Sequence, residues 1–182
     1  MLASIPPLPD EDAVCTDCGV AYASIGVPAA LELIQSMPGR VRTALLTIPD
    51  VIVRRRPDDT TWSVLEYLCH LRDVYAVYTI RLYRTRMEDS PTLEPMLNDL
   101  RAARFRYNHR HPASILAELA DNIAGLLDEA ARFSDHEWQR VATRLPGEER
   151  TAAWMVRQAM HEGMHHLRDI TNVAHRLTPA TD

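Results

Sequence analysis

The sequence predicts an all-α protein: a four-helix bundle with a long crossover connection and an irregular N-terminal arm. Apolar side chains recur at the spacing of one helical face in several long segments. Prolines and good N-cap residues stand where these segments begin or end. No stretch shows the alternation of a convincing β-strand. At 182 residues, the chain is long enough to bury one core without disulfides.

The arm spans residues 1–26, which contain several prolines and glycines and little apolar periodicity, so we expect irregular structure there. The bundle then occupies residues 27–178. Pro28 suits the first turn of the first helix, because proline fixes a helical φ and needs no amide partner there. We expect Pro38 to break or kink this helix before the pattern resumes over residues 40–48.

The second helix begins near Thr60 or Thr61, both good N-cap residues, and ends before Pro91. Its apolar and aromatic residues recur at helical spacing: Leu65, Leu68, Leu71, Tyr75, Tyr78 and Leu82. Residues 89–111 form a long connection with a short helix near 97–104. Such a crossover is typical of bundles with one overhand link.

The third main helix starts at Pro112 and ends around Phe133. Its apolar stripe consists of Ile115, Leu116, Leu119, Ile123, Leu126 and Leu127. A loop with Pro146 follows, and Thr151 then caps the last helix, which runs to about Leu177. The sequence therefore supplies four main helices.

Charge and hydropathy exclude some classes of partner. The net charge of −5 argues against nucleic acid, because nucleic-acid binders concentrate positive charge. No apolar run approaches the roughly 20 residues of a membrane span, and the first ten residues lack the features of a secretory signal. We therefore expect a cytoplasmic protein with no nucleic-acid or membrane partner. All basic residues are arginine, a bias typical of a GC-rich genome.

The last helix carries four potential metal ligands within six residues. They form two pairs at a spacing of four, His161 with His165 and Glu162 with His166, and each pair shares one face. The apolar stripe passes through Gly163. Glu162 and His166 lie roughly 60–100° from Gly163, at the edge of the stripe, whereas the other pair lies roughly 160° away. The stripe favours Glu162 and His166, with His161 and His165 as the alternative register.

A carboxylate and a neutral imidazole suit zinc, nickel or ferrous iron, and catalytic zinc centres keep three protein ligands and one open position. A third ligand is therefore needed. His70 lies in the middle of the second helix. Relative to a stripe centred on Leu68, it falls on the more polar side with Glu66 and Asp73, so spacing alone favours a surface histidine.

Two runs resemble a known family. They are Trp-Ser-x-x-Glu-Tyr-x-x-His-x-Arg-Asp over residues 62–73 and His-Glu-x-x-His-His-Leu-x-Asp-Ile over residues 161–170. Both are similar to signature helices of the DinB-like superfamily, which includes mycothiol-dependent maleylpyruvate isomerase. The resemblance implies a metal held by one histidine of the second helix and a [His or Glu]-x-x-x-His pair of the last helix. These positions match His70, Glu162 and His166.

The resemblance also implies a function: a metal-dependent transferase that joins a low-molecular-weight thiol, similar to mycothiol, to an electrophilic small molecule. Zinc is the favoured divalent metal, with nickel or iron as alternatives. A metal-dependent hydrolase is the second interpretation, with Asp169 or Glu66 as the catalytic acid or base. The third is a non-catalytic bundle that binds a small molecule or a partner chain. Surface-facing His161, His165 and Trp154 would be compatible with a homodimer interface.

Three cysteines are too few for a disulfide framework. Cys15 and Cys18 have the spacing of half a zinc site or of a redox pair, but no second pair follows at zinc-finger spacing. We therefore favour free thiols in an arm packed on the bundle. Cys69 is expected to be a small buried residue.

Overall fold

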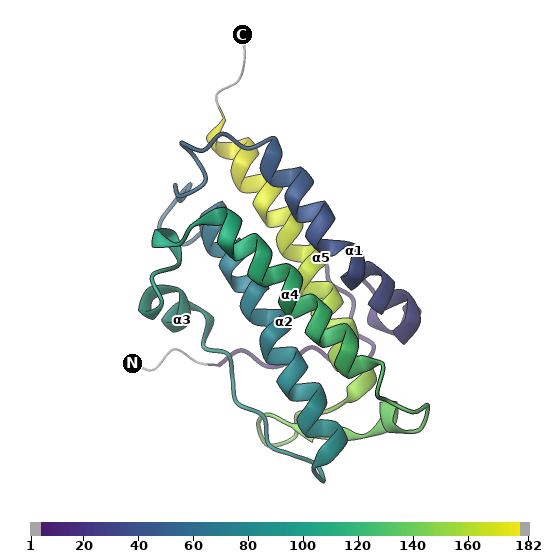
Figure 1. Ribbon diagram of the computed structural model, residues 1–182. Coiled ribbons are helices and arrows are strands. Elements are labelled where there is room, and N and C mark those ends of the chain that lie inside the picture. The colour runs from purple at the N-terminus through teal and green to yellow at the C-terminus, as the bar shows by residue number, and fades with distance from the viewer. Residues whose placement is uncertain (1–4, 179–182) are drawn as a thin grey trace.

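A computed structural model describes residues 5–178, so residues 1–4 of the predicted arm lie outside the described part. Four long helices form the bundle (Figure 1): α1 (Val27–Leu46), α2 (Val64–Met87), α4 (Pro112–Ala130) and α5 (Ala152–Leu177). Helix α2 packs against α4 and α5, and α1 completes the bundle by packing on the same two helices. The prediction of an all-α four-helix bundle is confirmed. None of the described helices has the length and apolar character of a membrane span.

The connection between α2 and α4 runs back along the side of the bundle, from the C-terminal end of α2 to the start of α4, and contains two short helical elements (Figure 1). These are α3 (Asn98–Arg104) and the 3-10 helix η2 (Tyr107–His109). Figure 1 shows α3 beside the bundle rather than within it. The predicted short helix in the crossover and the helix start at Pro112 are therefore confirmed.

Two short strands correct the prediction that the chain has none. A 3-10 turn η3 (Glu137–Gln139) leads into β1 (Val141–Thr143), which pairs antiparallel with β2 (Glu149–Thr151). Gly147 in the connecting turn has a φ of +82°, which favours glycine. Each strand has only three residues, too few for an alternating pattern to stand out in a sequence.

The sequence predicts a break or a kink at Pro38, and the break does not occur, because helix α1 continues through this residue. Proline inside a helix removes one backbone hydrogen bond and clashes with the preceding turn. The residues on either side, Ile34, Met37 and Val41, are fully buried in the core. Their burial offsets the lost bond, so tertiary packing overrides the local preference.

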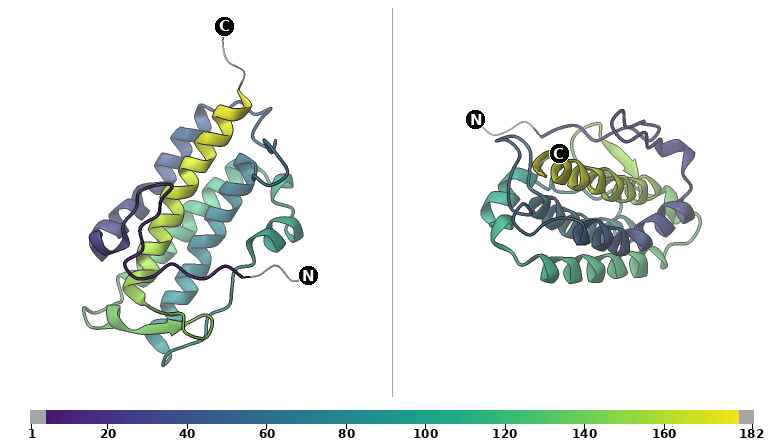
Figure 2. Two further views of the ribbon diagram at one scale, coloured as in Figure 1. Left: turned by 180° about the vertical axis from the view of Figure 1, so that it is seen from behind. Right: turned by 90° about the horizontal axis from the view of Figure 1, so that it is seen from above.

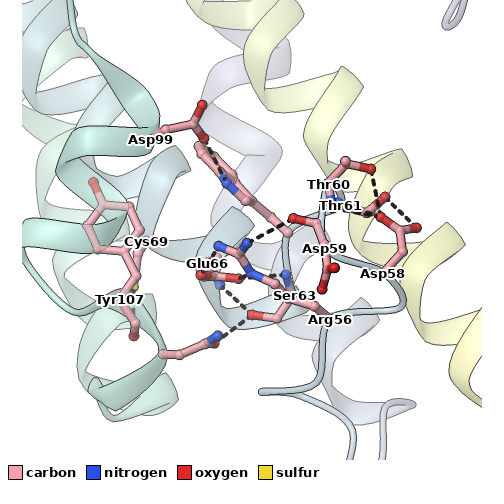
Figure 3. Close-up of polar contacts among 12 residues, drawn as sticks. Arg56, Asp58, Asp59, Thr60, Thr61, Ser63, Glu66, Cys69, Asp99 and Tyr107 are labelled. Carbon is pink, nitrogen blue, oxygen red and sulfur yellow. Dashed lines mark hydrogen bonds and ion pairs between the residues drawn. The ribbon is translucent and has the colours of Figure 1, made fainter. Parts of the chain in front are cut away.

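Helix α2 starts later than predicted, at a cap that the sequence analysis did not select. Ser63 Oγ accepts from the Glu66 amide at 3.1 Å, and Glu66 Oε2 accepts from the Ser63 amide at 2.9 Å, which forms a capping box. Thr60 and Thr61, the predicted caps, instead donate to Asp58 in the preceding turn (Figure 3). The true cap needs the reciprocal glutamate, which neither threonine has at the required spacing.

The N-terminal arm lies along β2 and α5 and ends in the 3-10 helix η1 (Tyr22–Ser24), as the view from behind shows (Figure 2). Arg157 Nε donates to the Ile25 carbonyl at 2.7 Å. Tyr22 is buried and its ring stacks on Trp154, with 6.2 Å between ring centroids. The arm covers this face of α5 and leaves Trp154 only 1% exposed, so Trp154 is a packing residue and does not offer a surface for a dimer interface.

Candidate metal centre

Three side chains from two helices converge at one carboxylate oxygen. Glu162 Oε2 on α5 lies 3.1 Å from His70 Nε2 on α2 and 3.1 Å from His166 Nε2, one turn further along α5. The three ligand atoms lie within 4.8 Å of one another. The structure thus brings together the three residues that the resemblance selected.

His70 is buried, although its spacing favoured a surface position. It is 2% exposed and packs edge-on against Trp62 and His166, with ring centroids 5.3 and 4.8 Å away. Helix α2 contacts α4, α5 and the crossover, so it is covered on most sides. The apolar stripe centred on Leu68 marks only one buried face of α2. A helix covered this widely also buries polar residues, and His70 is one of them.

Gly163 lets α2 and α5 approach closely beside Glu162. A Cβ atom at this position would overlap the hydroxyl of Tyr75 and lie 3.0 Å from Met37 Cε. The Tyr75 hydroxyl is buried and has no hydrogen-bond partner among the described residues. The missing side chain therefore makes room for the Tyr75 ring and sets the distance at which Glu162 meets His70.

Two further side chains hold the ligands in place. Asp169 Oδ2 accepts from His166 Nδ1 at 2.7 Å, and Gln158 Nε2 donates to Glu162 Oε1 at 2.7 Å. Such outer contacts fix the tautomer and orientation of metal-binding residues. Gln158 was not among the predicted site residues, although it stands four residues before Glu162 on the same helical face.

Burial and hydrogen bonding give the three groups different charges. Burial lowers the pKa of His70, which favours a neutral ring. Burial opposes ionisation of Glu162, but hydrogen bonds from His166 and His70 outweigh it and hold the pKa of Glu162 well below its usual range. Burial also disfavours a charged His166, yet Asp169 and Glu162 together raise its pKa to about 9. Without a metal, a carboxylate and an imidazolium therefore pair at this centre.

The donor set fits a divalent metal. Two imidazole nitrogens and one carboxylate oxygen are ligands of zinc, nickel and ferrous iron, and an ion would take the place of the protons that now join them. A surface cavity of about 420 Å³ adjoins the centre through Tyr67 and Asp169, both of which contact His166. The other residues that line it are Thr61, Asn172, Val173, His175 and Arg176. Three protein ligands would leave one position of a tetrahedral ion free.

The two predicted catalytic carboxylates have different surroundings. Asp169 touches the centre through His166. Glu66 does not: Arg56 donates to both of its oxygens, at 2.8 and 2.6 Å, and one oxygen also caps α2 (Figure 3). These contacts give Glu66 a structural role, and no contact favours a catalytic one.

The other histidine pair of α5 faces away from His70. His161 and His165 lie beside Cys15 and Cys18 of the arm, with one ligand atom from each residue within 4.8 Å of the others. The alternative register therefore does not complete the His70 centre. It belongs to a separate cluster.

The fold and the site together define a class: four-helix bundles with a His, Glu, His centre between two helices. The chain belongs to the DinB superfamily, whose sequence profile matches residues 33–170. YfiT from Bacillus subtilis, described as "a probable metal-dependent hydrolase with an unusual four-helix bundle topology", has a similar structure. The TM-score is 0.78 at 16% identity over 95% of each chain, a likeness that shows the fold. No curated protein matches the sequence.

Proposed function

We propose that the chain is a metal-dependent transferase that joins a low-molecular-weight thiol to an electrophilic small molecule. One observation carries the proposal: a cavity approaches the centre through Tyr67 and Asp169, while both carboxylates at the centre are already engaged. Glu162 accepts from two histidines and a glutamine, and Asp169 accepts from His166. A thiol needs no additional base once its pKa is lowered, whereas activation of water usually uses a free carboxylate.

A bound divalent metal would act as a Lewis acid that lowers the pKa of the thiol at neutral pH. The chain's own residues orient the reactants. Gln158 fixes the position of Glu162, and Asp169 fixes the ring of His166. Thr61, Asn172 and His175 offer polar groups in the cavity to a hydroxyl-rich thiol of the mycothiol kind.

In the transfer, a carbon–sulfur bond forms and the bond between that carbon and its leaving group breaks. The thiol proton passes to solvent, and the leaving group takes the bonding electron pair. No external oxidant or reductant is required, so the reaction needs only the two substrates and the metal.

Metal-dependent hydrolysis is the second candidate. The description of YfiT favours it, and the same three ligands would suit it. A thiol-free reaction would distinguish the two, because hydrolysis needs only water as the second substrate. Asp169 is then the carboxylate to test as a base, because it contacts the metal-binding His166 without being one of the three ligands itself.

The first test is metal content by elemental analysis for wild type, His70→Ala and Glu162→Gln. His109→Ala is the control, because His109 is exposed and lies outside the centre. We expect the first two variants to lose one equivalent of metal and the control to keep it. Metal-loaded protein is then incubated with a thiol and an alkylating electrophile, and adduct formation is followed by mass spectrometry. A panel of esters and amides without thiol is run in parallel.

Thiol-dependent adduct formation that His70→Ala abolishes would support the transferase. Turnover of esters or amides without thiol would support the hydrolase instead. Stoichiometric metal with no turnover in either assay would contradict both and favour a bundle that only binds a ligand or partner.

A further inference from the structure

A second cluster of metal-binding side chains lies where the arm crosses α5. Cys15 and Cys18 come from the arm, and His161 and His165 from α5. Cys15 Sγ lies 3.6 Å from His165 Nδ1, although the two residues are 150 positions apart in sequence. The imidazole centroids of His161 and His165 are 5.3 Å apart. Two thiols and two imidazoles thus meet at one point between the arm and the bundle.

The hydrogen bonds of His161 fix which of its nitrogens is free. The Tyr22 hydroxyl donates to Gln158 Oε1, so it accepts from His161 Nδ1–H, which lies 2.8 Å away. Nε2 of His161 is then left with a lone pair. This atom is buried and has no partner among the described residues. An unsatisfied buried acceptor is unfavourable, and a metal bond at Nε2 would satisfy it.

His165 shows the arrangement expected of a metal-binding histidine. Its Nδ1 faces Cys15 Sγ, and its Nε2 lies 3.6 Å from Asp169 Oδ2. Histidines that bind metals usually direct one ring nitrogen to the ion and the other to a carboxylate or carbonyl. His161 therefore has one nitrogen hydrogen-bonded to Tyr22 and the other available within the cluster, and His165 has one nitrogen near Asp169 and the other facing Cys15.

The arm presents its two thiols from a tight turn. The Gly19 amide donates to the Cys15 carbonyl at 2.8 Å, and the Cys15 amide donates to the Val20 carbonyl at 2.9 Å. Gly19 has a φ of +75°, which a residue with a side chain rarely adopts. Both cysteines are free thiols and partly buried. The turn brings Cys15 and Cys18 to the same side, toward α5.

We propose that Cys15, Cys18, His161 and His165 bind a second metal ion, zinc, in a closed tetrahedral site that fastens the arm to α5. Two thiolates and two imidazoles are a common donor set of structural zinc sites, and two thiolate charges balance one Zn²⁺. Binding releases the two thiol protons and changes no oxidation state. Four protein ligands leave no position for a substrate, so the site is structural. It does not depend on the proposed function.

Cobalt provides a test that separates the two centres. Co²⁺ replaces Zn²⁺ in tetrahedral sites, and only thiolate ligands give sulfur-to-cobalt charge-transfer absorption in the near ultraviolet. The full chain is therefore stripped with a chelator, titrated with Co²⁺ and followed by absorption. We expect one equivalent of Co²⁺ to produce the charge-transfer band and Zn²⁺ to remove it. His70→Ala should keep the band, because His70 belongs to the other centre.

Matched variants test the ligands themselves. Cys15→Ser with Cys18→Ser should abolish the band and lower the zinc content of the purified protein by one equivalent. Cys69→Ala should change neither, because Cys69 is buried away from the cluster. Circular dichroism checks that the variants keep their helices.

Three results would overturn the proposal. Wild-type protein could bind Co²⁺ without a charge-transfer band, or the band could survive in the double serine variant. Alternatively, mass spectrometry of protein purified without reductant could show a Cys15–Cys18 disulfide that zinc and reductant together do not replace. That outcome would identify a redox pair instead of a zinc site.

Discussion

Gly163→Ala tests whether the close approach of α2 and α5 sets the geometry of the His70 centre. A Cβ atom there would overlap the Tyr75 hydroxyl and lie 3.0 Å from Met37 Cε. Tyr75 is 0% exposed, so its ring cannot swing into solvent to relieve the overlap. The helices must then move apart, or the tyrosine must leave its rotamer.

Two opposing effects set the size of the change. Overpacking a core costs about 1–3 kcal/mol, and overlap with two side chains places this case in the upper half of that range. Alanine has a higher helix propensity than glycine, which stabilises the helix by about 1 kcal/mol and offsets part of this cost. We therefore expect Gly163→Ala to lower the free energy of unfolding by about 1–2 kcal/mol.

Urea denaturation in the presence of a chelator measures this change without a contribution from metal. With a slope of about 2 kcal/mol per molar urea, the midpoint should fall by about 0.5–1 M at unchanged slope. Gly125→Ala on α4 is the matched control, because its Cβ would meet nothing within 4 Å. That variant should gain up to about 1 kcal/mol from propensity alone.

The reasoning is refuted if both alanine variants raise the midpoint equally. Such a result would mean that Tyr75 and Met37 yield without cost, and that the glycine does not set the spacing between α2 and α5. A fall in the midpoint of Gly163→Ala with unchanged metal affinity would limit its role to packing.

Three further predictions concern groups outside the metal sites. Burial opposes ionisation of Asp73, but hydrogen bonds from Tyr107 and Arg101 hold the pKa of Asp73 below its usual range. Ionised Asp73 therefore stabilises the folded state fully above about pH 4, and this contribution is lost as the pH falls below that value. Asp73→Asn should make the free energy of unfolding fall less steeply as the pH is lowered. The same fall in the variant as in wild type would contradict this. Ser63→Ala removes the capping box and should cost about 1 kcal/mol in urea denaturation; no loss would refute the importance of the cap. Burial raises the pKa of Cys69 to about 12, so a thiol reagent at pH 8 should label it only after unfolding, and rapid native labelling would show that the thiol is accessible.

The parts of the fold that depend on local signals could be predicted from the sequence. Thr151 caps α5 and Pro112 starts α4, as expected, because capping and proline preferences involve only neighbouring residues. The stripe through Gly163 also placed Glu162 and His166 toward the core, because α5 is amphipathic and buries one clear face.

The parts that depend on tertiary contacts could not. His70 is polar and off the apolar stripe, yet it is buried, in a helix that packs against α4, α5 and the crossover. The spacing of apolar residues within one helix does not show how many other helices and loops pack around it. The meeting of Cys15 with His165 has the same origin, because 150 residues separate them and no spacing rule covers such a distance. The histidines that face the two cysteines therefore do not stand at zinc-finger spacing from them; the fold brings them together.

The two centres share one helix because its ligand pairs are offset by a single residue. His161 with His165 and Glu162 with His166 each span one turn, and the offset rotates one pair about 100° from the other. One pair therefore faces α2 and the other faces the arm. Asp169 lies between them, 2.7 Å from His166 and 3.6 Å from His165. Asp169 hydrogen-bonds to His166 alone, so the two centres share a helix and a neighbouring carboxylate while each keeps its own ligands.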